Sequence, residues 1–272
     1  MKTRTLLSAL MLSAGLACLV SCKKLMSEAM SAVMESAFNH DYQDSEKWGK
    51  VVTQSVPVLA FHEVELSGAV RLEYTQDSIY SLEVYGNEKA IEAYAISVED
   101  GELEASLKEN GGSVGKNTPA ITLRITAPSL SEIQGAGAAD IVFKDSIAQD
   151  EEMDISISGA GKLDLGTYLK LNALDMTVSG SGEVSMPSLC CTEDVEMDLM
   201  GVADIDGKIS CRKLKLKMSG AGDGKLDIDC RQARISASGS VNATLSGQCD
   251  DISYTASGSS TVKTDGLKTG KE

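Results

Sequence analysis

A small-residue unit that recurs between residues 134 and 264 decides the fold of this chain. It reads QGAGAADI (134–141), SGAGKLDL (158–165), SGSGEVSM (179–186), MGVADID (200–206), SGAGDGKLDI (219–228), SGSVNATL (238–245) and SGSSTVKT (257–264). The leading glycines are Gly135, Gly159, Gly180, Gly201, Gly220, Gly239 and Gly258. They are spaced by 24, 21, 21, 19, 19 and 19 residues. A period near twenty without an internal helical pattern indicates stacked coils of β-structure.

Apolar and polar residues alternate within each unit. Leu174, Met176 and Val178, for example, are separated by Asp175 and Thr177. Alternation with a period of two is typical of half-buried strands, and the glycines suit corners where φ is positive. The chain has only 3 Phe in 272 residues, which agrees with a narrow core. We therefore predict an all-β fold, a right-handed parallel β-helix (solenoid) of about seven short coils with an N-terminal β-strand cap.

The chain divides into four predicted parts. Residues 1–21 form a signal peptide, and residues 22–50 form a tether. Alternating runs such as FHEVELSGAVRLEYTQ and AITLRITAP predict an N-terminal β cap with the first coils over residues 51–128. The solenoid repeats follow over residues 129–272 and end in a polar C-terminal cap. Caps are expected because an open coil edge would pair with other strands.

The N-terminus has the organisation of an export signal. Lys2 and Arg4 precede an apolar stretch over residues 5–20, which is too short and too early for an ordinary transmembrane helix. The stretch ends in Leu-Val-Ser-Cys at 19–22 and resembles the bacterial lipobox. We therefore predict lipidation of Cys22, where two acyl chains would anchor the protein stably. The alternative is an ordinary secretory signal with a chance cysteine beside its cleavage site.

The tether carries apolar residues at helical spacing. Met26, Met30, Met34 and Phe38 follow one another in steps of four, which places them on one face of a helix. Three interpretations remain open: a short helix packed on the domain, a flexible linker, and a helix lying on the membrane surface. Acidic residues in the same stretch weaken the third, because anionic lipid headgroups would repel them.

Four cysteines share the period of the repeat. Cys190, Cys211, Cys230 and Cys249 each follow a leading glycine by ten residues, and Leu169 holds the equivalent place one coil earlier. A leucine there marks an apolar core position, so we expect a ladder of stacked reduced thiols. One or two disulfides, or a soft metal, are the alternatives. Cys191 is expected to face the other way. The cysteines that follow Cys22 number five, and this odd number leaves at least one thiol unpaired.

The composition excludes several classes of function. Lys+Arg total 25 against 40 Asp+Glu, and a formal net charge of −15 argues against nucleic-acid binding. The 2 histidines, His40 and His62, leave little room for histidine catalysis or a histidine metal centre. Carboxylate pairs such as Asp204/Asp206 and Asp227/Asp229 arise by chance in an acidic repeat. We therefore predict no catalytic residues, no metal ligands and no cofactor, and regular calcium binding is disfavoured because the repeats lack an aspartate at a fixed place.

Several segments together carry a resemblance to a known family. They are FHEVELSGAVRLEYTQ (61–76), GELEAS (101–106) and ITLRITAPSLSEIQGAGAADI (121–141), the last containing Pro128, Leu130 and Ile133 as a P-x-L-x-x-I step, followed by the serial SGAG and SGSG units. Over residues 51–265 they resemble the head-GIN domain family, whose members are described as "putative auto-transporter adhesins" and are common in Bacteroidetes, often as exported lipoproteins. The resemblance implies a parallel β-helix similar to pectin-lyase-like solenoids, without the catalytic residues of the lyases. Met200 replaces the usual serine before Gly201, which predicts a wider corner there.

These features favour a non-catalytic, lipid-anchored protein of the cell envelope, an adhesin-like binding or scaffold module. The alternatives are a polysaccharide-acting β-helix enzyme and a periplasmic envelope-structural or stress protein. The expected partners are the membrane, through the lipid, and a protein or glycan ligand. Surface lipoproteins of Bacteroidetes tend to carry acidic residues after the cysteine, whereas Lys23 and Lys24 follow Cys22 here. The periplasmic face of the outer membrane is therefore favoured over the cell surface.

Overall fold

The computed structural model describes residues 28, 32, 38, 45–108 and 118–270. The predicted signal peptide, Cys22 and most of the predicted tether lie outside these residues. The helices are α2 (Ser45–Trp48) and α3 (Glu88–Glu92). The strands are β1 (Val51–Val56), β2 (Glu63–Gln76), β3 (Ser81–Asn87), β4 (Tyr94–Glu99), β5 (Glu102–Leu107), β6 (Ile121–Ala127), β7 (Glu132–Phe143), β8 (Ile147–Ala148), β9 (Met153–Asp164), β10 (Leu169–Leu171), β11 (Leu174–Cys191), β12 (Asp194–Gly258) and β13 (Thr261–Thr269).

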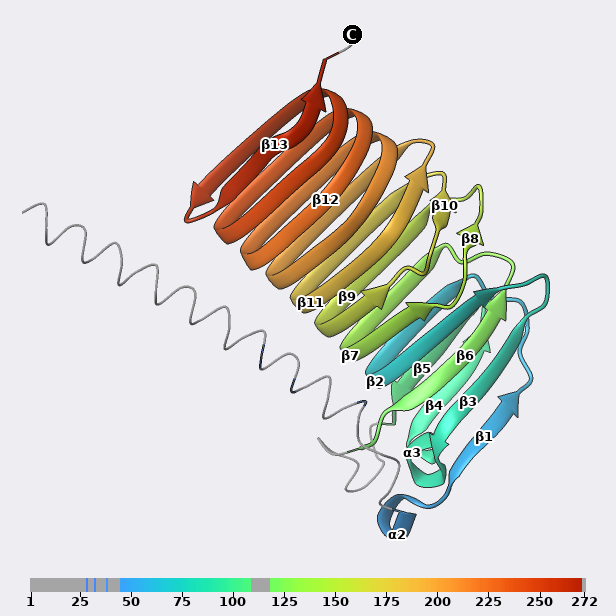
Figure 1. Cartoon of the computed structure of the whole chain (residues 1–272). Coiled ribbons are helices and arrows are strands. Elements are labelled where there is room, and N and C mark those ends of the chain that lie inside the picture. Colours follow the sequence, from blue (N-terminus) through green and yellow to red (C-terminus); the bar gives the residue numbers. More distant parts are fainter. Residues whose placement is uncertain (1–27, 29–31, 33–37, 39–44, 109–117, 271–272) are drawn as a thin grey trace, which may run out of the picture.

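The thirteen strands of the described residues belong to one mixed sheet. The order β1-β3-β6-β2-β7-β9-β11-β10-β8 describes its main path, β12 pairs with β11 and β13, and β5 joins β2 to β4. Pairing is antiparallel for β1–β3, β3–β6 and β4–β5, and parallel elsewhere. The sheet is continuous from the N-terminal strands into the repeats, because β2 pairs with β7. In Figure 1 it curls around its core and stays open on one side.

The predicted fold class is therefore only partly right. The chain is all-β, but a right-handed parallel β-helix of about seven short coils is wrong, because the sheet is mixed and forms an open, curled half-barrel. The repeats do pair in parallel, yet the strands bend through their glycines instead of ending there, so that β12 runs without a break for 65 residues. The antiparallel N-terminal strands carry no repeat, and for that reason the periodicity did not reveal how they pair.

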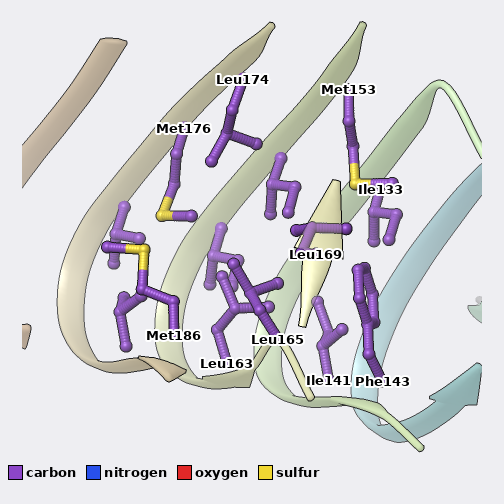
Figure 2. Packing of buried hydrophobic residues seen from close by; sticks show 14 of the residues in the cluster. Ile133, Ile141, Phe143, Met153, Leu163, Leu165, Leu169, Leu174, Met176 and Met186 are labelled. Carbon is purple, nitrogen blue, oxygen red and sulfur yellow. The ribbon is translucent and has the colours of Figure 1, made fainter. Parts of the chain in front are cut away.

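Each repeat folds into two strand arms joined at a glycine bend. In β11 the first arm precedes Gly180 and the second arm follows it. Figure 2 shows Leu174 and Met176 of the first arm pointing across the core toward Met186 of the second. Every other residue along each arm is buried in this way, while the residues between them point outward. The core is thus thin and mostly aliphatic, and each repeat presents two outer surfaces.

The largest buried side chains lie toward the N-terminal end of the core. Tyr74 and Phe143 pack edge to face with ring centroids 5.4 Å apart. The Tyr94 hydroxyl donates to the carbonyl oxygen of Ala69 and accepts from its backbone N–H, both at 3.0 Å. At the other end, β13 is mostly exposed. The core therefore carries its bulkiest side chains toward its N-terminal end, whereas its C-terminal strand is mostly exposed.

Candidate functional site

The outward side chains of the first arms form one continuous surface, which we call the front face. Thr177 of β11 lies on it, in register with Ser156 of β9 and Asp198 of β12. The strands β2, β4, β5 and β7 extend the same surface toward the N-terminus. Because parallel neighbours are in register, chemically similar residues on the front face stand directly side by side.

Seven carboxylates line up in a single register row across this face, the acidic row. Each member comes from a different strand and pairs directly with the next. In spatial order they are Glu99, Glu102, Glu63, Glu132, Asp154, Asp175 and Glu196. Neighbouring strands lie about 4.8 Å apart, so that the row concentrates negative charge along one line.

Two members of the acidic row are weaker acids than free side chains. Loss of solvent is the largest cause of the raised pKa of Glu102, and the carboxylates of Glu65, in the adjacent row, and Glu63 add to it. Loss of solvent also raises the pKa of Asp175, and its row neighbours Glu196 and Asp154 add to the rise. Burial and nearby negative charge thus both disfavour the charged form of these groups.

Basic residues bound the acidic row at its C-terminal end. Lys215 lies one repeat beyond Glu196 and forms an ion pair with it. In the adjacent row, Lys217 Nζ lies 2.6 Å from Asp198 Oδ2. Within the row, His62 Nε2 lies 3.3 Å from Glu63 Oε1. The front face is thus acidic across the N-terminal strands and the first repeats, and mixed in charge from β12 onward.

The second arms arrange their charges differently. One of their rows contains Arg71, Asp140, Lys162 and Glu183 on successive strands. Arg71 Nη1 lies 2.8 Å from Asp140 Oδ2, and Lys162 Nζ lies 3.7 Å from Glu183 Oε2. Opposite charges therefore alternate over these four strands, where the front face carries only carboxylates in the acidic row, and the second-arm row then continues from Glu183 to Asp204. The fold itself does not impose the acidic row.

The predicted turn glycines form a row of paired residues across the repeats, but one of the seven was assigned to the wrong residue. Gly159, Gly180 and Gly201 pair with one another in register. The residue that pairs with Gly159 in β7 is Gly137, whereas Gly135 pairs with Ile157. Gly220, Gly239 and Gly258 continue the row, because an added Cβ on each would meet the carbonyl oxygen of the preceding glycine. Gly135 is therefore corrected to Gly137, which shortens the first spacing from 24 to 22 residues, close to the 21 of the next two repeats.

The cysteine row also needs a correction. Cys191, Cys211, Cys230 and Cys249 are buried and belong to the core, whereas Cys190 is half-exposed and pairs with Ser210. The reason is a bulge: between Met186 and Leu189, β11 has one residue more than β12 between the corresponding partners. One extra residue reverses which side chains point inward. The core position equivalent to Cys191 is accordingly Leu171, not Leu169.

The last two cysteines of this row are in direct contact. Cys230 Sγ lies 3.4 Å from Cys249 Sγ, and Cys249 Sγ lies 3.1 Å from the carbonyl oxygen of Asp251. Burial raises the pKa of the Cys249 thiol to about 12. A hollow of about 690 Å³ reaches them, lined also by Cys211, Arg231 and Lys268. All five cysteines of the described chain are free thiols.

The acidic pairs singled out in the sequence do not converge on a common point. Asp204 and Asp229 lie on the outer side of the second arms, where Asp204 accepts from the backbone N–H of Asp223 at 2.6 Å. Asp229 accepts from the amide of Gln248 at 2.8 Å. Within the described ranges, no three His, Cys, Asp or Glu residues are grouped closely enough to hold a metal ion.

Sequence reasoning missed the acidic row because three of its members lie outside the repeat. Glu63, Glu99 and Glu102 belong to strands whose mutual pairing no period reveals. A signal was nevertheless present: FHEVELS, GELEAS and SEI each place a glutamate at the start of an alternating run. If the strands predicted by these runs are placed side by side with their starts in register, the glutamates fall into one row.

Solved structures of similar fold come from Bacteroidetes. The chain resembles a "putative adhesin" from Bacteroides fragilis with a TM-score of 0.62 and 21% identity, over 79% of this chain and 96% of that one. A "putative lipid binding protein" from Parabacteroides distasonis gives a TM-score of 0.62 and 18% identity, over 82% and 98%. A "putative adhesin" from the same species gives 0.58 and 17%, over 82% and 97%. These identities establish similarity of fold alone.

Curated protein sequences contain no match to this chain. A family model does match, over residues 60–208 and again over residues 193–271. The two matches together include nearly all of the described sheet, with the front face, the glycine row and the cysteine row. The chain therefore belongs to the family described as "putative auto-transporter adhesin, head GIN domain".

Proposed function

We propose that this protein is a non-catalytic, adhesin-like binding module of the bacterial cell envelope, anchored by lipid at Cys22. Its front face is the contact surface, and its ligand is a protein or a glycan. The observation that carries the proposal is the charge pattern of the two outer surfaces. Across the strands β2, β7, β9 and β11, opposite charges alternate in a row of the second arms, whereas the acidic row of the front face carries a carboxylate on each of them.

An unbalanced row of like charges costs stability unless something else selects for it. Like charges directly opposite each other on neighbouring strands destabilise a sheet, and neighbouring carboxylates add to the effect of lost solvent in raising the pKa values of Glu102 and Asp175. A surface that contacts a partner can keep such a pattern, because complementary potentials speed and orient association. The regular spacing of the strands makes the surface flat and extended, and it is suited to a large partner.

The family and its solved members support the same proposal. The family description and two of the similar structures use the word adhesin, and a third is described as lipid binding. Envelope location follows from the predicted lipobox. No helix within the described part of the chain is long and apolar enough to cross a membrane. In this proposal the lipid on Cys22 holds the protein, and Lys23 and Lys24 favour the periplasmic face.

The test is co-sedimentation of the purified full-length protein with envelope fragments from a strain that lacks the gene. Bound protein and soluble reducing ends are measured in the same samples. We expect saturable binding and no reducing ends above the blank. Release of reducing ends in proportion to protein would instead establish the polysaccharide-acting alternative, and absence of saturable binding would contradict the proposal.

A matched pair of substitutions locates the contact surface. Thr177 and Ser185 lie on the same strand β11 and are both half-buried, but they point outward from opposite arms. We expect Thr177→Arg to weaken binding at least about tenfold, because a long cation there obstructs the front face and changes its charge. Ser185→Arg should bind like the unmodified protein. Equal binding by both variants would exclude the front face as the contact surface.

A further inference from the structure

We propose that Cys230 and Cys249 are a redox-active pair that forms a disulfide between the last two complete repeats. The observation is the separation of 3.4 Å between the two Sγ atoms, which brings the thiols into contact across neighbouring strands. Nothing in the adhesin role uses these residues, because they lie in the core and not on the front face.

The backbone separation suits a cross-link. Cys230 and Cys249 occupy the same position in successive repeats of 19 residues, and neighbouring in-register strands lie about 4.8 Å apart. Disulfides join Cα atoms that are about 4.4–6.8 Å apart. Bond formation therefore requires the side chains to draw together, with a small inward shift of the two strands and no change of register.

The surroundings of the pair provide a route for the oxidant. Both cysteines are buried but line the hollow of about 690 Å³, together with Lys268 and Gly270. The next strand in this direction is β13, whose Thr269 pairs with Cys249 and is itself exposed. Cys249 thus lies next to the terminal strand, where opening of the sheet requires the least disruption.

The chemistry is thiol–disulfide exchange with a low-molecular-weight disulfide, written XSSX. The Cys249 thiolate attacks one sulfur of XSSX, which forms a mixed disulfide and expels XS⁻. The Cys230 thiolate then attacks the Cys249 sulfur and expels the second XS⁻. Two protein thiols are oxidised, XSSX is reduced to two XSH, and the two protons lost by the protein are taken up by the leaving thiolates. An exported location, which rests on the proposed function, would supply such an oxidant.

The neighbouring cysteines define the alternatives. Cys211 stands on the other side of Cys230 in the row and is part of the same hollow. Because Cys230 can join only one neighbour, a bond to Cys249 leaves Cys211 as a thiol. Cys190 is half-exposed on the outer side of its strand and has no cysteine opposite it, since it pairs with Ser210. Substitution of Cys190 is therefore the matched control.

The test is peptide mapping of the full-length protein after incubation with reduced and oxidised glutathione at increasing ratio. Samples are quenched with acid, alkylated while unfolded and digested with trypsin. Cleavage at lysine and arginine places Cys211 on residues 209–212, Cys230 on 226–231 and Cys249 on 235–263, so that each thiol is read separately. We expect 226–231 linked to 235–263, and the alkylated thiols of the described chain to fall from five to three.

Variants separate this pair from its competitors. Cys211→Ala and Cys190→Ala should retain the linked peptides, whereas Cys230→Ala and Cys249→Ala should lose them. A link between 209–212 and 226–231 in the unmodified protein would overturn the assignment, as would glutathione adducts on Cys249 without an internal bond. Full alkylation of all five thiols at the highest oxidised ratio would overturn the proposal itself. The map of the unmodified protein decides this even if a variant fails to fold.

Discussion

Gly220 illustrates, at the scale of a single residue, why one glycine recurs in every repeat. Its φ is +113°, a conformation that residues with a side chain rarely adopt. A Cβ at this position would also meet the carbonyl oxygen of Gly201 at 2.1 Å. The sequence predicted the row from its period alone. It could not distinguish Gly135 from Gly137, because two closely spaced glycines satisfy the same period and only strand pairing selects one.

Gly220→Ala should lower the free energy of unfolding by about 3 kcal/mol, because the strained φ and the backbone clash combine. The measurement is urea unfolding followed by circular dichroism. Gly224→Ala in the same repeat is the control: its φ is not in the positive range, and its new Cβ would meet the flexible end of Met218 at 3.1 Å. A cost below about 1 kcal/mol is expected for the control. Equal costs for both variants would contradict this account of the bend.

Arg71→Met should destabilise the protein by about 3 kcal/mol, because the Asp140 carboxylate is 8% exposed and would lose its close cation. Burial already raises the pKa of Asp140, and Arg71 opposes that rise. Without Arg71 the folded state holds the Asp140 proton more tightly than the unfolded state. The loss of stability should therefore be largest at neutral pH and shrink as the pH falls through the raised pKa.

Arg124→Met is the control for this prediction. The Arg124 side chain is 45% exposed, and its partner Glu73 keeps Arg71 and Lys144 as neighbours. We expect a change below about 1 kcal/mol, as for other exposed ion pairs. Urea unfolding of both variants between pH 4 and 8 measures the difference. A pH-independent loss in Arg71→Met would show that lost packing, and not the buried charge, is responsible.

Individual strands decide which side chains face inward. In β11 the extra residue between Met186 and Leu189 moves Cys191 into the core and turns Cys190 outward. The period of the repeat predicted a cysteine row but chose Cys190, because counting from Gly180 cannot detect a bulge. The alternation within each arm was easier to predict, since the inward positions of Leu174 and Met176 depend only on the two-residue period.

Asp175→Asn should stabilise the sheet at neutral pH by about 0.5 kcal/mol, because it removes like-charge repulsion in the acidic row. The raised pKa of Asp175 means that the folded state binds its proton more readily than the unfolded state. The stabilising effect of Asp175→Asn should consequently be largest at neutral pH and shrink as the pH falls toward 4, where Asp175 in the unmodified protein takes up its proton. Thermal unfolding at several pH values measures both effects.

The control for Asp175→Asn is a carboxylate on the second arm. Glu183→Gln removes a carboxylate that lies 3.7 Å from Lys162 and pairs in register with Asp204, so the lost ion pair and the relieved repulsion offset each other and stability should stay nearly unchanged. Added salt should raise the melting temperature of the unmodified protein more than that of Asp175→Asn, since screening weakens repulsion. A stabilising Glu183→Gln would show that net charge alone, and not the acidic row, explains the effect.

The whole molecule combines a part that the sequence predicts well with a part that it does not. The regular spacing of the repeats predicts that equivalent positions pair, and the repeats do stack in parallel and in register. The N-terminal strands have no period, and their antiparallel pairing follows from local hairpins such as the turn between β4 and β5, where Asp100 and Gly101 have positive φ. The mixed, open sheet is the result. The front face spans both parts, which is why its charge pattern was not predicted.

Cys22→Ala should release the protein from the membrane, because no acyl chains can then be attached. The measurement is fractionation of cells after labelling with a radioactive fatty acid. We expect the unmodified protein in the membrane fraction with label and the variant in the soluble fraction without it. Cys190→Ala, which leaves the lipobox intact, should behave like the unmodified protein. A membrane-bound, labelled Cys22→Ala would contradict lipid anchoring.

The central claim is that the front face of the anchored protein contacts a partner in the envelope. The most direct measurement is photo-cross-linking in intact cells, with the reactive residue at Ser156 on the front face or at Glu183 on the second arm, both of which are exposed. The account predicts one recurrent cross-linked species from Ser156 and none from Glu183. The same species from both positions, or none from Ser156, would contradict it.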